Sequence, residues 1–183
     1  MKAWLFYPLM AALVAGLVAF AWTRGERAIP LTVEQVRAQG YVLEGEDLAY
    51  LTASPGTEVV VGEGLARARM VDDRASSPPS AGVFATLIPV HEAAFGGREI
   101  EVEWRLRRPD GPGRVEIGYF TIGAGDSGWR EVEVDEAWTD ASFRFAPRAP
   151  VEEGFDYVGL WPGVGEPDGS AIEIERVTVR LAR

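Results

Sequence analysis

The sequence predicts an all-β domain, an antiparallel two-sheet sandwich, preceded by a single N-terminal transmembrane helix. Two observations lead to this fold class. Residues 3–22 contain no charged side chain, whereas the chain beyond residue 28 is rich in charged residues, glycine and proline. From residue 41 onward, apolar and polar side chains alternate with the period of two that indicates strands, and Gly/Pro turns separate them. Many short strands joined in this way are typical of a sandwich.

The N-terminal apolar stretch is long enough to span a bilayer. Its 20 residues, at about 1.5 Å of helical rise each, give about 30 Å, the thickness of the hydrocarbon core. A cleavable signal peptide is the alternative, because Lys2 supplies a basic start and Ala19-Phe20-Ala21 supplies a small-x-small site. The apolar region of such a peptide is only about 7–15 residues long. We therefore expect a retained transmembrane anchor or signal-anchor at residues 1–23, in contact with the membrane through residues 3–22.

The flanks and the spacing of this stretch predict its orientation and a possible helix contact. The charge bias between Lys2 on one side and Arg24 and Arg27 on the other is nearly balanced. A short N-terminal anchor before one β-rich domain usually exports that domain, so we expect a single-pass protein of the cytoplasmic membrane with a periplasmic or otherwise extracytoplasmic domain. Small residues at four-residue spacing would let another transmembrane helix approach closely; they are Ala11, Ala12, Ala15, Gly16 and Ala19.

Residues 24–40 are predicted to form a juxtamembrane linker and one short helix. Thr32 can cap this helix, Gln35 three residues later completes a capping box, and Gly40 ends it. A helix of this length is unstable alone and must pack on the rest of the domain.

The sandwich is expected to occupy residues 41–183. Residues 98–108 give the clearest alternation, with Trp104 among the apolar residues of one face and Arg105 and Arg107 among the charged residues of the other. In the last segment, Ile174 and Val177 have opposite parity, and a β-bulge near Glu175 would bring them to the same face. The predicted strands are 58–61, 66–71, 83–89, 98–108, 115–119, 132–134, 143–145 and 172–181, with a loop at 72–81.

Composition excludes some classes of partner. The chain carries 18 Lys and Arg against 28 Asp and Glu, a net charge of −10, and Lys2 is its only lysine. Such an acidic surface repels phosphate backbones, so no nucleic-acid partner is expected. The absence of cysteine excludes a disulfide framework and a cysteine-based zinc site.

Several short strings occur in a characteristic order: LIP at 87–89, FGGREI at 95–100, WRLR at 104–107, SGWR at 127–130, FDYVGLWP at 155–162 and IEIERV at 172–177. This order resembles the galactose-binding-like jelly rolls, which include carbohydrate-binding modules of the cellulase-associated type. The resemblance covers roughly residues 48–183 and implies a jelly-roll sandwich. Members of that family bind sugars, lipids or proteins, or brace an enzyme. A structural calcium is common in the fold, but Arg176 replaces one of a pair of acidic residues, so we predict no cofactor.

Aromatic and arginine side chains are the candidate ligand contacts. Sugar-binding sandwiches stack aromatic rings on pyranose faces, and Trp129, Trp138 and Trp161 lie at strand–loop junctions where exposure is expected. Trp104, Tyr119, Phe143 and Phe145 have the apolar parity of core residues. The outward arginines have two interpretations: cross-strand ion pairs on a solvated face, or a groove that binds hydroxyls or carboxylates. The predicted ligand-binding residues are Trp129, Trp161, Arg105, Arg107 and Asp126.

No residues qualify as a catalytic or metal site. His91 is the only histidine, the chain has no Gly-x-Ser-x-Gly motif, and no segment has the ligand spacing of a calcium loop. Two hypotheses for function follow. The first is a non-catalytic, membrane-anchored module that binds cell-envelope or secreted carbohydrate. The second is an accessory single-span subunit that packs on a larger membrane protein complex and braces it.

Overall fold

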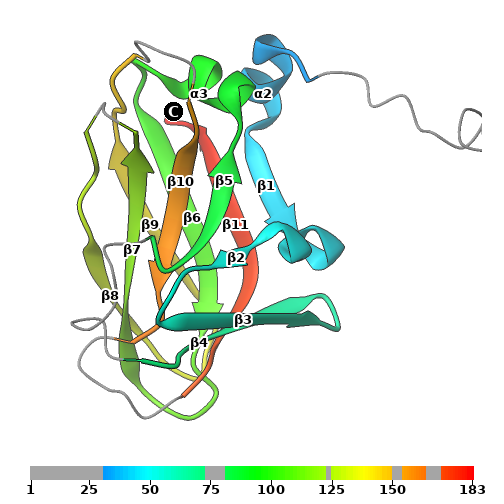
Figure 1. Cartoon of the computed structure of the whole chain (residues 1–183), viewed down its shortest axis with the longest axis vertical. Coiled ribbons are helices and arrows are strands. Elements are labelled where there is room, and N and C mark those ends of the chain that lie inside the picture. Colours follow the sequence, from blue (N-terminus) through cyan, green and yellow to red (C-terminus); the bar gives the residue numbers. More distant parts are fainter. Residues whose placement is uncertain (1–30, 73–80, 123–124, 150–153, 164–169) are drawn as a thin grey trace, which may run out of the picture. The chain divides into compact units, whose positions relative to one another are not determined.

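The computed structural model describes residues 31–72, 81–122, 125–149, 154–163 and 170–183 (Figure 1). The transmembrane helix and small-residue contacts predicted within residues 1–23 lie outside these ranges, as does nearly all of the predicted 72–81 loop. Among the helices of the described part of the chain, none combines the length and the apolar character that a membrane span requires.

The short helix predicted before the sandwich is confirmed. It is α2 (Val33–Gln39), and its N-terminus has the full capping box. The backbone N–H of Gln35 donates to Thr32 Oγ1 at 3.3 Å, and the backbone N–H of Thr32 donates to Gln35 Oε1 at 2.9 Å. Gly40 ends the helix with a positive φ of 77°, a conformation that glycine adopts without steric cost.

The larger sheet is antiparallel and has its middle strand at the end of the described chain. Its strands are β1 (Tyr41–Glu44), β3 (Thr57–Gly62), β4 (Leu65–Met70), β6 (Ile100–Arg107), β9 (Thr139–Phe145) and β11 (Ile172–Leu181). The order is β3-β4-β11-β6-β9, and β1 also pairs with β11. The pairing of β11 with β6 shifts register between Ile174 and Arg176, which confirms the predicted bulge, and both Ile174 and Val177 are fully buried.

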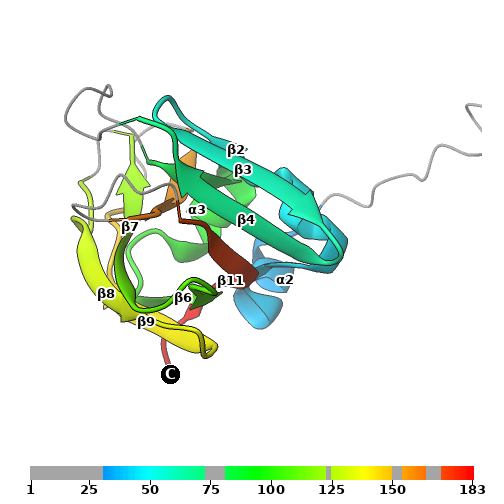
Figure 2. The same ribbon diagram turned by 90° about the horizontal axis from the view of Figure 1, so that it is seen from below.

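The second sheet covers the other side of the core. Its antiparallel strands follow the order β10 (Asp156–Trp161), β7 (Gly113–Thr121) and β8 (Arg130–Val134). The pair β2 (Thr52–Ala53) and β5 (Val83–Leu87) extends this layer, because β5 lies beside β10 and Gly82 forms a bridge to Leu160 (Figure 1). The view from below shows the β3–β4 hairpin along one flank, away from β8 and β9 (Figure 2). The all-β two-sheet sandwich predicted from the sequence is therefore confirmed.

The core lies between the two sheets, and alternation in the strands decides which side chains fill it. Along β6, every second residue is buried, including Trp104. Tyr119 and Phe143 are also buried, and Phe145 packs against them while partly buried. These four residues were predicted from their parity to belong to the core, and the structure confirms that assignment.

Two short helical segments were not predicted. The strand expected at 83–89 ends at Leu87, and residues Pro89–Phe95 form α3, so His91 lies on a helix and not at a strand end. Proline suits the first turn of a helix because that position needs no N–H donor. The residue before it, Ile88, makes no side-chain capping hydrogen bond, which is why no capping signal was visible. A 3-10 helix, η1 (Gly45–Tyr50), also follows β1.

Candidate functional site

The outer face of the second sheet presents aromatic side chains above a pair of glycines. In β7, Ile117 and Tyr119 are buried in the core, so Gly118 and Phe120 face outward. In β10, Tyr157 is the direct cross-strand partner of Phe120, and Gly159 is the partner of Gly118. The same register therefore places two rings side by side next to two positions without side chains.

Two more rings extend this pair into a row. The Phe84 ring, from β5, lies 5.3 Å from the Tyr157 ring in an edge-on arrangement, and the Trp129 ring lies 4.7 Å from the Phe120 ring. All four side chains are half-buried. We call this row, Phe84, Tyr157, Phe120 and Trp129, the aromatic platform. Because neighbouring strands are about 4.8 Å apart, a row across four adjacent segments is about 14 Å long.

The glycines let Phe120 lie close to the sheet. A Cβ on Gly118 would lie 2.7 Å from Cζ of the Phe120 ring, and a Cβ on Gly159 would lie 3.1 Å from its Cε2. A Cβ on Gly159 would also lie only 2.4 Å from the backbone oxygen of Ala81. Contacts of 2.7 and 2.4 Å essentially never occur for a Cβ atom, so side chains at these two positions would displace the ring or the neighbouring backbone.

The segment before β8 positions Trp129. Ser127 is bonded to Tyr119 twice: its backbone N–H donates to the Tyr119 carbonyl at 2.9 Å, and its Oγ accepts from the Tyr119 N–H at 2.8 Å. Asp126 Oδ1 accepts from the backbone N–H of Thr121 at 3.2 Å. Asp126, a predicted ligand residue, therefore holds the turn at the end of β7 and lies close to the platform. Trp129 itself is part of the platform.

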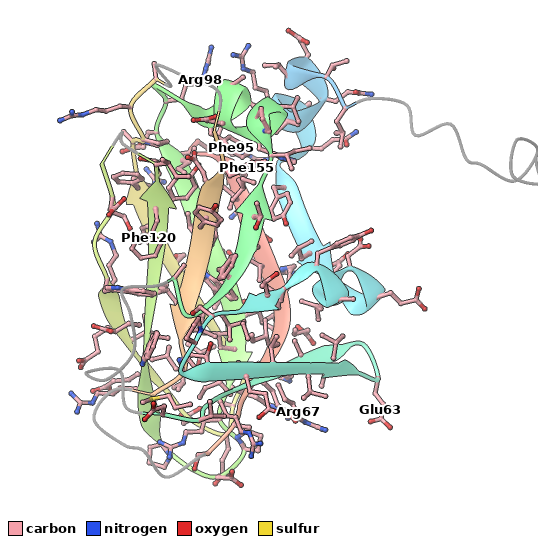
Figure 3. The ribbon with its side chains drawn as sticks, viewed as in Figure 1. Glu63, Arg67, Phe95, Arg98, Phe120 and Phe155 are labelled. Atoms are coloured by element: carbon pink, nitrogen blue, oxygen red, sulfur yellow. The ribbon has the colours of Figure 1, made fainter. Side chains whose placement is uncertain are left out.

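Along the strands, the platform has apolar residues on one side and acidic residues on the other. At the first, Ile122 and Phe155 are 68% and 45% exposed, and Figure 3 labels Phe155 beside β10 and Phe120 beside β7. At the second, Glu131 lies directly across from Glu116 and forms an ion pair of 2.9 Å with Arg114. The face therefore offers both flat apolar surface and carboxylate hydrogen-bond acceptors.

A buried tyrosine–carboxyl pair lies directly beneath the platform. The Tyr119 hydroxyl donates to Asp156 Oδ2 at 2.5 Å, and Asp156 is only 2% exposed. The pKa of Asp156 is raised to about 6: burial is the largest cause, the Tyr119 hydrogen bond opposes it, and the negative charge of Glu92 adds to it. Burial and the Asp156 charge raise the pKa of Tyr119 well above its usual range.

The two predicted arginines lie on the other face of the molecule. Arg105 and Arg107 point outward from β6 in the larger sheet, where they belong to a layer of cross-strand ion pairs. Arg105 binds Asp140 and Glu175, and Arg107 binds Glu173. Their donors therefore meet carboxylates of the same sheet, and the structure does not bring them together with Trp129 and Asp126.

The three tryptophans at strand–loop junctions differ in exposure. Trp161 was expected to be exposed but is 1% exposed, because the backbone at Gly82 lies against its ring. Trp138 is half-buried on the outer face of the larger sheet, where the Arg107 guanidinium lies 4.6 Å from the centre of its ring. Trp129 alone of the three joins the aromatic platform.

His91 and the acidic residues form no metal centre within the described ranges. His91 is buried, with its ring edge-on to Tyr41 and stacked near Phe95, and burial lowers its pKa. In the described part of the chain, no three histidine or carboxylate side chains come close enough together to hold a metal ion.

Comparison with solved structures shows a likeness in fold to carbohydrate-binding modules. No protein-family profile matches the sequence, and no curated protein matches it. A CBM4 structure shares 13% identity and a TM-score of 0.51, over 78% of this chain and 86% of that chain. The xylan-binding CBM22-1 domain of Xyn10C from Paenibacillus barcinonensis shares 14% identity and a TM-score of 0.50, over 79% and 96%. The CBM22-1–CBM22-2 tandem of the same protein shares 15% identity and a TM-score of 0.51, over 79% of this chain and 46% of that chain. The likeness establishes a jelly-roll β-sandwich.

Proposed function

We propose that this domain is a non-catalytic carbohydrate-binding module and that the aromatic platform is its contact surface. The observation that carries the proposal is the row of four half-buried rings across adjacent segments of one sheet. Aromatic rings offer flat, apolar surfaces that match the apolar faces of pyranose rings. The fold supports the proposal, since the structural neighbours are carbohydrate-binding modules and one of them is described as xylan-binding.

The geometry favours some of the predicted ligand contacts over others. Trp129 is a direct contact in this proposal, and Asp126 supports the segment that positions it. Trp161 is a packing residue because its side chain is buried. Arg105 and Arg107 stabilise the larger sheet through their ion pairs and lie outside the proposed site.

The test compares two platform variants with a matched tryptophan on the opposite face. Isothermal titration calorimetry with soluble xylan and other neutral polysaccharides would use the full-length chain, in a detergent whose headgroup contains no sugar. Trp129→Ala and Phe120→Ala are expected to weaken binding at least about tenfold, which corresponds to about 1.4 kcal/mol. Trp138→Ala changes a half-buried tryptophan that packs against Arg107 on the opposite face, and this variant should bind like the wild type. Equal affinities for Trp129→Ala and the wild type would contradict the proposal.

We also propose that residues 1–23 anchor the domain to the cytoplasmic membrane on the extracytoplasmic side. This rests on the 20 residues without charge from 3 to 22. Mild-detergent purification followed by mass spectrometry tests it, because a retained anchor leaves residues 1–23 on the recovered chain. A stoichiometric membrane partner that is lost on Ala15→Leu would favour the accessory-subunit hypothesis over the carbohydrate-binding module.

A further inference from the structure

Two rings of the aromatic platform and the buried pair beneath them come from consecutive residues of two neighbouring strands, β7 and β10. Phe120 and Tyr157 are direct cross-strand partners on the outer face. The residues that precede each of them, Tyr119 and Asp156, face inward and are joined by the 2.5 Å hydrogen bond. Only one peptide unit in each strand therefore separates the inner pair from the outer pair, which gives a change in the inner pair a short route to the rings.

The inner pair is fixed from both sheets. The Tyr119 ring packs 5.7 Å from the ring of Phe145 in β9 of the opposite sheet. The backbone N–H and carbonyl of Tyr119 both form hydrogen bonds with Ser127, which lies two residues before Trp129. Tyr119 is thus connected to the two strands and to the segment that supply three of the four platform rings.

Asp156 has little to stabilise a negative charge. Its Oδ2 accepts the Tyr119 hydroxyl, and its Oδ1 is buried without a hydrogen-bond partner in the described part of the chain. From α3, the carboxylate of Glu92 faces the same region and accepts the N–H of Gly154 at 3.0 Å. No arginine of the described residues forms an ion pair with either carboxylate. From β9, the residue that packs against this pair is Phe145, which carries no charge.

We propose that Tyr119 and Asp156 are positioning residues for the aromatic platform, and that protonation of Asp156 controls how tightly the platform binds its ligand. This inference rests on the proposed function, because it needs the platform to be the ligand-binding surface. The inward-facing residues of β7 and β10 then set the geometry of the Phe120–Tyr157 pair, which the outer rings cannot set alone.

The direction of the effect follows from the charges. The pKa of Asp156 is raised to about 6 by burial and by Glu92, so the carboxyl is neutral at pH 5 and ionised at pH 7.5. Ionisation places a second negative charge near Glu92 in the interior, next to Gly154 and the first residue of β10. The start of β10 then shifts to relieve the repulsion, and the ring of Tyr157 moves with it. Affinity should therefore fall as pH rises through about 6.

The experiment measures xylan affinity of the full-length chain from pH 5 to pH 8. If only the protonated form binds, the dissociation constant rises by about tenfold between pH 5 and pH 7. Asp156→Asn, which stays neutral, should remove this pH dependence. Glu92→Gln removes the like charge and should move the midpoint to lower pH. Tyr119→Phe removes a hydrogen bond that lowers the pKa of Asp156, so it should move the midpoint to higher pH. The exposed Glu136→Gln is the control and should leave the profile unchanged.

A second readout needs no ligand and separates the two proposals. The ring proton shifts of Phe120 and Tyr157 in NMR should titrate with the midpoint of Asp156 and lose that titration in Asp156→Asn. The positioning role would be overturned if the ring proton shifts do not titrate with Asp156, or if Asp156→Asn leaves the pH profile of binding unchanged. The carbohydrate-binding function would stand in either case. If the rings titrate as expected but no polysaccharide binds at any pH, the proposed function and the control of affinity both fail, while the structural coupling of Asp156 to the rings stands.

Discussion

Glu173 joins three strands on the outer face of the larger sheet, and its removal is expected to destabilise the domain. It lies on β11, directly across from Arg67 of β4 and Arg107 of β6. It accepts from their Nε atoms at 3.0 and 2.7 Å. Burial alone would raise the pKa of Glu173, but the hydrogen bonds from Arg107 and Arg67 outweigh it and lower the pKa. The carboxylate is therefore ionised and doubly bonded at neutral pH.

The magnitude follows from the burial of the three partners. A hydrogen bond to a charged group contributes about 1.5–3 kcal/mol. The Glu173 side chain is 6% exposed, but Arg67 and Arg107 are 60% and 35% exposed. When Glu173 is removed, water therefore replaces part of the hydrogen bonding that the two arginines lose. We expect Glu173→Ala to lower the free energy of unfolding by about 2 kcal/mol, or the melting temperature by about 4–8 °C. In the control pair Glu58–Arg69, the side chains are 41% and 52% exposed, and Glu58→Ala should cost at most about 1 kcal/mol.

Urea denaturation at pH 7, followed by tryptophan fluorescence, measures both variants. Because the folded-state pKa of Glu173 is lowered, its contribution is present above the usual glutamate pKa and is lost as the pH falls through the lowered value. The difference between the wild type and Glu173→Ala should therefore shrink in acid. Equal losses for Glu173→Ala and Glu58→Ala at pH 7 would refute the argument that burial sets the strength of these pairs.

Three further outcomes are expected. Because the pKa of Asp156 is raised from 3.8 to about 6, its contribution to stability is lost as pH rises through 6. Asp156→Asn should therefore gain up to about 3 kcal/mol at pH 7 and nothing at pH 3, measured by urea unfolding. Trp161→Ala removes a buried ring and should cost about 3–5 kcal/mol in thermal unfolding, far more than Trp129→Ala; similar losses would contradict the burial of Trp161. Gly159→Ala should cost about 1–3 kcal/mol, because its Cβ would meet Ala81 O at 2.4 Å; an unchanged denaturation midpoint would contradict this.

Periodicity was sufficient to predict much of the fold. The alternation in β6 predicted which of its residues are buried, because a strand with one face in the core and one in water must alternate. The change of parity between Ile174 and Val177 predicted the bulge, because both residues had to reach the same core. In both cases the signal lies within one strand.

The site was harder to predict because it depends on pairing between distant strands. Phe120 and Tyr157 are cross-strand partners, yet nothing local indicates that register. One signal was available: in β7 both parities are non-polar from Ile117 to Phe120, which indicates a strand with little water on its outer face. Trp161 was misjudged for a similar reason, since the backbone at Gly82 that covers it is far away in the sequence.

The position of β11 has a consequence for biosynthesis. This strand pairs with β1, β4 and β6, and all three precede it in the chain. A ribosome that makes the protein from the N-terminus therefore releases three strands with open edges before the strand that joins them exists. Contacts between segments so distant in sequence form slowly, and open edges are prone to pair with other chains. A chaperone that shields β4 and β6 until β11 emerges would protect the nascent chain at its most vulnerable stage.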